Sequence, residues 1–371
     1  MDLRISMQHG LSFGLVMAIP RGELRDMHLS LPAWGFLRDS YGIARHPVGK
    51  IAEEDLSPTA SYDPLKKEVM PGSAGIARYK IAPEEHLKPL IFLPDHRECI
   101  DGLNLLDSEG YVKSRVVVIG NRDLGNNYGF IAWDSGKSPR WFSLRNEPID
   151  QKTYTSLIWS PHRGPAIAPV RFEASSGSFV PVHADGSKAL PDDIAWLTYG
   201  QQVLRSGEPV DIEEIINQFY DIRHLFYFNL AKQEEQNLLR ELTSLYADPP
   251  EFRKQLLDLW LSGRPRSRYL HNAVGVGPDR LVIVQRYGTP EEIGVWLRDA
   301  GATDGILLDN GGSVFTWGWW AGVGTRDGRR RGGVIFSSPD WRPPSISVIA
   351  IVLKGAVRHD EPPGSIGFTV T

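Results

Sequence analysis

The segment Asp309-Asn310-Gly311-Gly312-Ser313 carries the residue types in this chain that are best suited to chemistry. A carboxylate, an amide and a hydroxyl bracket two glycines, which lack a Cβ atom and therefore allow unusual backbone angles and close approach of a ligand. At the end of a strand, such a turn can present polar side chains and backbone N–H groups to a sugar or a phosphate. Asn-Gly is also the strongest short hairpin signal, and the pentapeptide taken alone favours a hairpin.

The segments before this turn predict the elements that position it. Leu281 to Gln285 is a short apolar run that is typical of a buried strand. A helix should follow, with Thr289 as N-cap, Pro290 at its first position and Glu292 completing a capping box. Gly301 can end this helix in a left-handed conformation. The next expected strand runs from Gly305 to Leu308 and leads into the turn.

Several segments follow one another in an order that carries a further interpretation. They are His271-Asn272-Ala273-Val274-Gly275-Val276, the strand Leu281 to Gln285, Gly301-Ala302, Leu308-Asp309-Asn310-Gly311-Gly312-Ser313, and Trp341-Arg342-Pro343-Pro344 before the apolar run Ser347 to Leu353. This order resembles the phosphodiester glycosidase family, in which an R-T-A-x-G segment, a strand, a helix ending near Gly-Ala, an L-D-G-G-G-S signature and an Arg-Pro element succeed one another. The resemblance covers residues 195 to 355, with one long interruption.

The chain departs from the family pattern at three places. Asn310 stands where the family has the first glycine of its signature, and His271-Asn272 stands where it has Arg-Thr. The family's early Asn-Gly-Gly segment has no clear counterpart, because Ile119-Gly120-Asn121 and Asn126 to Phe130 fit it poorly. These departures favour a divergent member that keeps the fold while its substrate or reaction has changed.

The resemblance implies an α+β fold with a mixed, strand-rich core of the phosphodiester glycosidase type. Residues 1–110 are expected to form an N-terminal region of strands and loops, either a small domain or an extension of the main one, and residues 111–371 the glycosidase-like domain. Apolar residues at helical spacing predict a helical insertion over residues 211–263. Its aromatic residues favour a packed core, and a lid over the pocket or a contact between two copies is the alternative.

The family's activity, carried over to this chain, is hydrolysis or transfer of a sugar that is linked through a phosphodiester at its anomeric carbon. Asp309 matches the aspartate of the family signature and is expected to be the catalytic carboxylate. His271 departs from the family pattern, and it is expected to act as acid or base because its ordinary pKa lies near neutral. Arg342, in the family's Arg-Pro element, is expected as a phosphate ligand. The arginine run Arg264 to Arg268 suggests Arg268 as a second one, although a short run of this kind is more often simply solvated. The remaining substrate-binding residues would be Asn272, Asn310, Gly311, Gly312 and Ser313.

Two other function classes remain open at this stage. The altered signature also fits a non-catalytic protein that binds a phosphorylated sugar or a nucleotide on the same scaffold. It fits equally an enzyme of changed chemistry that acts on a nucleotide or on a glycosylated metabolite. The partner predicted in each case is a small molecule, either a sugar phosphodiester or a nucleotide sugar.

Composition and charge exclude other partners and suggest a compartment. A net charge of −4 over 371 residues gives no general attraction to nucleic acid or to an anionic membrane. The single cysteine, Cys99, excludes an intramolecular disulfide and suits a reducing compartment, so a cytoplasmic location is expected. Leu11 to Pro20 is too short to span a bilayer and predicts a first strand. Asp304, Asp309 and Asp340 follow no calcium-loop spacing, so no metal and no cofactor is predicted, although a divalent cation is left open.

Overall fold

The computed structural model describes most of the strand and helix framework of the chain. The described residues are 2–8, 11–30, 61–63, 68–70, 79–80, 113–123, 131–133, 140–142, 150–176, 178–182, 194–218, 222–319, 333–338, 346–357 and 368–370. Cys99, Arg342 and Asp340 lie outside these ranges, as does the arginine-rich segment between residues 320 and 332.

The largest sheet has eight strands and is antiparallel except where its last two strands, β1 and β22, run parallel. Its order across the sheet is β15 (Glu208–Pro209), β14 (Gln201–Arg205), β18 (Asp304–Leu307), β16 (Tyr269–Val276), β17 (Arg280–Gly288), β2 (Leu11–Pro20), β1 (Asp2–Gln8) and β22 (Phe368–Val370). The strands predicted at Leu11, Leu281 and Gly305 are therefore confirmed. Because β2 pairs with β17, residues 11–20 belong to the same sheet as the segments around the turn.

A five-stranded antiparallel sheet packs against the first. Its order is β20 (Gly333–Ser337), β19 (Phe315–Gly318), β7 (Ser114–Asp123), β21 (Ile346–Ala356) and β3 (Leu24–Ser30). The main apolar core lies between these two sheets and includes Met17 and Ile283 from the first and Ile119, Trp317 and Ile351 from the second. Alternation along β17 places Leu281 and Ile283 in this core and Val282 and Val284 on the opposite face.

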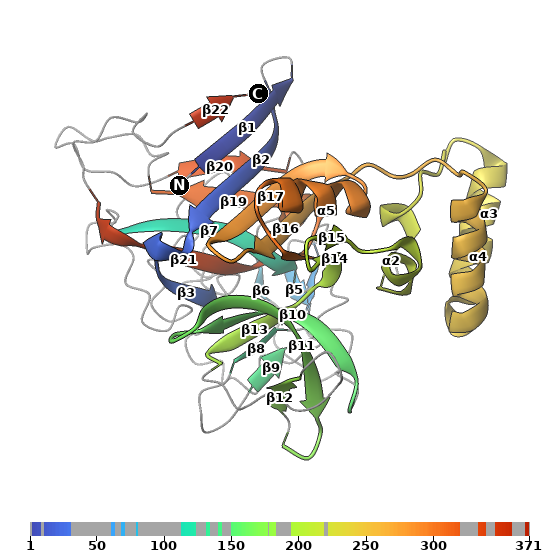
Figure 1. Ribbon diagram of the computed structural model, residues 1–371. Helices are drawn as coiled ribbons and strands as arrows, with labels where there is room; N and C mark the ends of the chain where they lie inside the picture. The colour runs from blue at the N-terminus through green and yellow to red at the C-terminus, as the bar shows by residue number, and fades with distance from the viewer. Residues whose placement is uncertain are drawn as a thin grey trace.

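The described residues form two further sheets. The six-stranded sheet has the order β12 (Ser178–Pro181), β11 (Gly164–Glu173), β10 (Thr153–Ser160), β13 (Trp196–Tyr199), β8 (Ile131–Trp133) and β9 (Arg140–Phe142). The small three-stranded sheet consists of β4 (Ser61–Asp63), β5 (Glu68–Met70) and β6 (Tyr79–Lys80). Figure 1 shows the six-stranded sheet, in green, below the other two large sheets.

The helix α5 (Pro290–Asp299) covers the outer face of the eight-stranded sheet. Its start has the predicted capping box, in which the Thr289 side chain accepts from the backbone of Glu292 and the Glu292 side chain accepts from the backbone of Thr289. Gly301 follows the helix with φ +97°, as predicted for its left-handed end. Ile293 and Leu297 are fully buried against the sheet, so local sequence signals and tertiary packing agree here.

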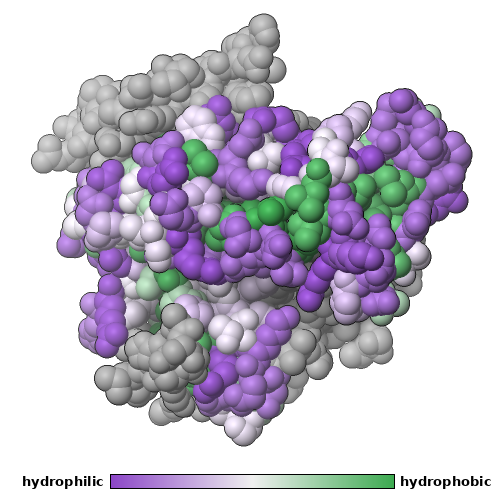
Figure 2. Space-filling model, turned by 45° about the vertical axis from the view of Figure 1, so that its right-hand side comes forward, coloured by the Kyte–Doolittle hydropathy of each residue, from purple (hydrophilic) through white to green (hydrophobic). Residues whose placement is uncertain are grey.

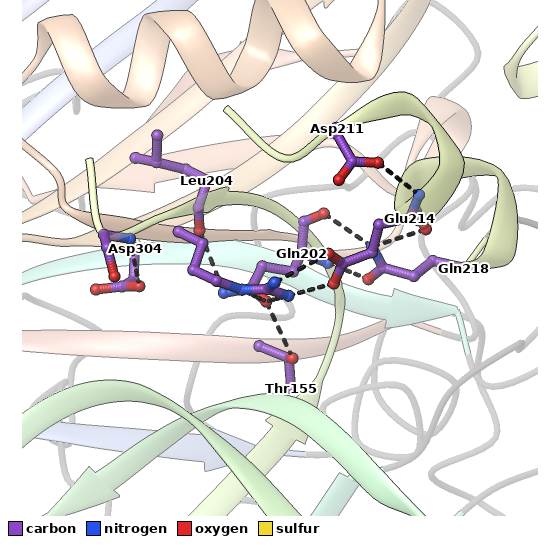
Figure 3. A network of polar contacts seen from close by, with 9 residues as sticks. Thr155, Gln202, Leu204, Asp211, Glu214, Gln218 and Asp304 are labelled. Carbon is purple, nitrogen blue, oxygen red and sulfur yellow. Dashed lines mark hydrogen bonds and ion pairs between the residues drawn. The ribbon is translucent and has the colours of Figure 1, made fainter. Parts of the chain in front are cut away.

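The helical insertion is confirmed and consists of α2 (Ile212–Gln218), α3 (Gln233–Ser244) and α4 (Pro249–Leu261), with 3-10 turns at η6 (Ile222–His224) and η7 (Leu245–Ala247). Pro249 and Pro250 are the first residues of α4 and follow the N-cap Asp248. Polar contacts join α2 to the sheets (Figure 3). The backbone N–H of Gln202 in β14 donates to the side chain of Gln218 in α2, and the Thr155 hydroxyl of β10 donates to the side chain of Gln202. A further 3-10 turn, η1 (Arg21–Glu23), connects β2 to β3.

The insertion projects from the sheets, and α3 and α4 stand apart at the right of Figure 1. Phe226 and Phe228 are buried in it, as the core interpretation predicts, whereas Tyr227, Leu230, Tyr246 and Leu261 are exposed. Figure 2 shows apolar surface on the side of the molecule that carries the insertion. A role as a lid or as a contact between copies stays a prediction. No helix in the described ranges is long and apolar enough to cross a membrane.

Candidate functional site

The turn after β18 connects two different sheets. β18 pairs with β14 and β16 in the eight-stranded sheet, and β19 pairs with β7 and β20 in the five-stranded sheet. The hairpin expected from Asn-Gly is therefore wrong, because the two strands never pair with each other. Instead, Gly311–Ser313 forms the 3-10 turn η8, and Gly311 adopts φ +60° with the Tyr269 hydroxyl where a Cβ would stand.

Asp309 is held at the start of this turn by two hydrogen bonds. The Ser313 hydroxyl donates to Oδ2 of Asp309 over 2.5 Å. The backbone N–H of Asp309 donates to the carbonyl oxygen of Asn121 over 2.7 Å. The carboxylate remains partly exposed, whereas Ser313 is buried. An oriented and partly accessible carboxylate at a strand end is suited to act on a bound substrate.

The close fit of the turn against β7 also depends on Gly120. A Cβ at this position would lie 2.2 Å from the carbonyl oxygen of Ser313. No side chain fits at that distance, so glycine is required for the backbone of β7 to approach η8. Ile119-Gly120-Asn121, a poor sequence match to the family's early segment, thus lies directly beside the turn.

A chain of buried amides and one hydroxyl supports the turn from within the core. Asn272 donates through Nδ2 to the carbonyl oxygen of Gly120 over 2.6 Å and accepts at Oδ1 from Gln285 over 3.0 Å. Gln285 also donates to the carbonyl oxygen of Phe315 over 2.9 Å and accepts from the Thr316 hydroxyl over 2.7 Å. All three polar side chains are fully buried. These bonds join the eight-stranded sheet to the five-stranded sheet beneath the site.

Asn121 extends this polar network to the third large sheet. Its Oδ1 accepts from the Thr198 hydroxyl of β13 over 3.0 Å, and its Nδ2 donates to Oγ of Ser347 in β21 over 3.1 Å. The backbone N–H of Asn272 donates to Oδ1 of Asn310 over 3.3 Å. Through Asn121, the turn at residues 309–313 is therefore connected to elements of three sheets.

His271 lies on the other face of β16 from Asn272. Its neighbour along that face, Tyr269, stands edge-on to it at 6.1 Å and stacks on His224 of η6 at 4.3 Å. Its side chain is fully buried, and neither ring nitrogen has a hydrogen-bond partner of good geometry among the residues that the structure describes. The pKa of His271 is lowered to about 3, mainly by burial and to a lesser extent by the charge of His224, while contacts with Asn310 and Gly288 oppose this shift.

With this pKa, His271 is neutral at physiological pH. The expectation that it titrates near neutral pH, which is the basis for its role as acid or base, is therefore wrong. Below pH 6.5 the unfolded chain binds a proton at this position, whereas the folded chain does not until about pH 3. The free energy of unfolding should therefore fall as the pH drops from 6.5 to 3, by up to about 1.4 kcal/mol per pH unit from this residue.

Chemical denaturation of the wild type and of His271→Gln between pH 6.5 and 4 measures this effect. The wild type should lose stability more steeply than the variant, and His162→Gln, at an exposed turn, controls for the loss of a histidine as such. Parallel stability profiles for the wild type and His271→Gln would show that His271 titrates normally in the folded protein.

Arg122 is a buried cation beside the turn, at the end of β7. Its side chain is 3% exposed, and its guanidinium carbon lies 5.7 Å from the ring centre of Tyr199. Burial lowers the pKa of Arg122, and attraction to Asp309 and Tyr199 opposes this. A carboxylate and a guanidinium thus approach the same turn from different sheets.

The remaining residues that the sequence analysis considered for the site lie at different places in the fold. Arg268 is exposed and pairs with Glu292 of α5 over 2.6 Å between Nη1 and Oε1. Gly312 lies within η8 and is partly exposed, whereas Arg342 falls outside the described residues. Asp304 lies at the opposite end of β18 from Asp309 and accepts from the backbone of Ser206.

Sequence reasoning missed Arg122, Gln285 and Thr316. Gln285 could have been identified, because it is the single amide at the end of the apolar strand Leu281 to Gln285. Asn121-Arg122-Asp123 likewise follows the β-branched run Val116 to Ile119, so polar residues at that strand end were candidates. Thr316 had no signal, because nothing in the sequence shows that β19 faces β17.

Comparisons with known proteins give only distant similarities. No protein-family model and no curated protein matches the sequence. Among solved structures, the chain is similar to the zebrafish N-acetylglucosamine-1-phosphodiester alpha-N-acetylglucosaminidase catalytic domain auto-inhibited by its pro-peptide, with a TM-score of 0.35 and 16% identity over 65% of this chain and 64% of that one. It is also similar to a hypothetical protein from Synechocystis, with a TM-score of 0.32 and 9% identity over 94% of this chain and 61% of that one. The matched regions span less than two thirds of either structure, and similarity at this level carries no argument about activity.

Proposed function

We propose that this protein hydrolyses, or transfers, a sugar that is attached through a phosphodiester at its anomeric carbon. The observation that carries the proposal is the Asp309 carboxylate, which Ser313 and the backbone of Asn121 orient at a partly exposed turn between two sheets. Asp309 would act on the anomeric carbon as nucleophile, as base for an attacking water, or as a charge that stabilises the developing cation.

The neutral state of His271 is compatible with this substrate class. When the bond between the anomeric carbon and oxygen breaks, the electron pair goes to the phosphate oxygen, and water supplies the hydroxyl group to the sugar. A phosphate is a stable anion at neutral pH, so its departure needs no proton from a general acid. An ordinary alkyl glycoside does need such an acid, because an alkoxide is a poor leaving group. With the pKa of His271 near 3, the site suits the phosphodiester better.

The remaining predicted residues receive supporting roles in this proposal. Asn310, Gly311, Gly312 and Ser313 would shape the turn and orient substrate oxygens. Asn272 uses its amide for Gly120 and Gln285, so we assign it to supporting the turn from the buried side. Arg342 as a phosphate ligand, and the cytoplasmic location, stay predictions.

A second candidate is a non-catalytic protein that binds a phosphorylated sugar or a nucleotide at the same turn. The buried, neutral His271 favours it, because the residue implied as acid or base does not titrate near neutral pH. The two candidates share the binding site and differ in turnover, so one experiment separates them.

A turnover screen against sugar phosphodiesters, nucleotide sugars and alkyl glycosides tests the proposed function. We expect the wild type to release free sugar from at least one phosphodiester and from none of the alkyl glycosides. Analysis of the products also identifies an enzyme of changed chemistry, which would release a different product. Binding of these compounds without turnover would instead support the recognition protein, and hydrolysis of alkyl glycosides would contradict the leaving-group argument.

A further inference from the structure

The side chain of Arg122 occupies a fixed position beside the turn. Its backbone N–H donates to Oγ of Ser347 over 3.2 Å, and the same hydroxyl group donates to the Arg122 carbonyl oxygen over 3.2 Å. Its neighbour Asn121 is bonded to Thr198, Ser347 and Asp309. The strand end that carries the guanidinium is therefore tied to all three large sheets, which leaves the side chain little freedom to leave the site.

Two nitrogen atoms of this guanidinium, Nε and Nη2, are buried and make no hydrogen bond in the described part of the protein. A buried charged group without hydrogen bonds is costly, because water no longer solvates it and no protein group replaces the water. The attraction of Asp309 and the ring of Tyr199 offset only part of this cost. Such a cost is expected at a functional site, where a ligand supplies the missing partners.

The identity of the two unpaired atoms indicates the shape of the ligand. Nε and Nη2 lie along one edge of the planar guanidinium, and their N–H bonds point in the same direction. This edge matches two oxygen atoms of one phosphate or carboxylate group through two parallel hydrogen bonds. A single neutral acceptor would satisfy only one of the two donors.

We propose that Arg122 binds the phosphate group of the substrate through Nε and Nη2. The inference rests on the proposed function for the identity of the ligand, because Asp309, in the turn beside Arg122, would then face the sugar that this phosphate carries. It assigns the anion site to the end of β7. Arg268 is less suited, because it is exposed and already paired with Glu292.

Burial also predicts how the anion reaches this site. Since the Arg122 side chain is 3% exposed, neighbouring residues must shift before a phosphate contacts its edge. Association should therefore be slower than the ~10⁵–10⁷ M⁻¹s⁻¹ that is typical when no conformational change is required.

Calorimetric titration with inorganic phosphate and with glucose 1-phosphate tests the assignment in the full-length protein. We expect Arg122→Gln to bind both about 10- to 100-fold more weakly than the wild type, because two charge-assisted hydrogen bonds are lost. Arg122→Lys should be intermediate, because an ammonium keeps the charge but not the parallel donors. Arg298→Gln, which removes an exposed arginine paired with Asp299 on α5, is the matched control and should bind as the wild type does.

The melting temperature of each protein without ligand separates ligand binding from a structural role. If Arg122 serves the ligand, Arg122→Gln should be at least as stable as the wild type without phosphate, and phosphate should raise the melting temperature of the wild type only. If Arg122→Gln fails to fold, Arg122→Lys is compared with the wild type instead. Wild-type affinity in both Arg122 variants, or loss of affinity in Arg268→Gln alone, would overturn the assignment, as would a wild type that binds neither anion.

These outcomes are distinguishable from failure of the proposed function. Phosphate binding that depends on Arg122 in a protein without turnover would keep the anion site and reject the glycosidase. Turnover that depends on Asp309 but has an unchanged KM in Arg122→Gln would keep the glycosidase and reject the anion site.

Discussion

Replacing Asp309 with asparagine is expected to lower kcat/KM for a sugar phosphodiester by about 10²–10⁴-fold, the range over which positioned acid–base groups contribute. Asparagine has nearly the same shape and still offers an oxygen to the Ser313 hydroxyl, so the turn should persist. It has no negative charge and cannot accept a proton or stabilise a developing cation. The loss should therefore appear mainly in kcat, and phosphate binding at Arg122 should not weaken.

Steady-state kinetics on the wild type, Asp309→Asn and Asp304→Asn measure this effect. Asp304 is the matched control, because it begins the strand β18 that leads to Asp309 and lies at the far end from the turn, bonded to the backbone of Ser206. Its variant should keep wild-type kcat/KM. Equal activity in the wild type and Asp309→Asn would remove Asp309 from the mechanism and leave the recognition protein as the better proposal.

Gln285→Leu is expected to have the largest effect on stability, lowering the free energy of unfolding by about 2–4 kcal/mol. Leucine has a similar volume, but it leaves Oδ1 of Asn272, the carbonyl oxygen of Phe315 and the Thr316 hydroxyl without the partner that Gln285 provides. All of these groups lie in the core between two sheets, where water does not readily replace the lost bonds. The cost therefore comes from unpaired polar groups rather than from a cavity.

Urea denaturation of the wild type and four variants tests this explanation. Thr316→Val removes the hydroxyl group that Gln285→Leu leaves without a hydrogen-bond partner. The double variant Gln285→Leu/Thr316→Val should therefore be more stable than the sum of the two single effects predicts. Gln233→Leu, at the exposed start of α3, should change stability by less than about 0.5 kcal/mol and controls for the loss of an amide. Additive effects of the two core substitutions would show that Gln285 and Thr316 do not act on each other.

The helical insertion has an exposed apolar surface and also contacts the edge of the site. Tyr227, Leu230, Tyr246 and Leu261 are exposed on it, while the stacking of His224 on Tyr269 connects its first part to the edge of the site. The stacked pair provides a physical route by which movement of the insertion would reach Gly311, because the Tyr269 hydroxyl lies against that glycine.

Local interactions explain why several elements were predictable. The capping box at Thr289 and Glu292, the left-handed Gly301 and the apolar strand at Leu281 depend on residues within a few positions of one another. The helical insertion was likewise visible, because helical spacing of apolar residues is a property of one segment. Asp309 was found as a polar residue at a strand end, which is also a local feature.

The assembly of the site was not predictable in the same way. The sequence by itself determined the elements and the polar turn, but the turn's path from one sheet to another depends on strand pairing between segments that are far apart in the chain. Asn-Gly predicts a hairpin only when the flanking strands pair, and here β18 and β19 each find other partners. Only the tertiary structure brings Arg122 to Asp309 across 187 positions of sequence, the difference between 309 and 122, and only it buries His271 deeply enough to lower its pKa to about 3. Burial and long-range pairing are properties of the whole packed chain, so they decide charge and contact at the site where local sequence cannot.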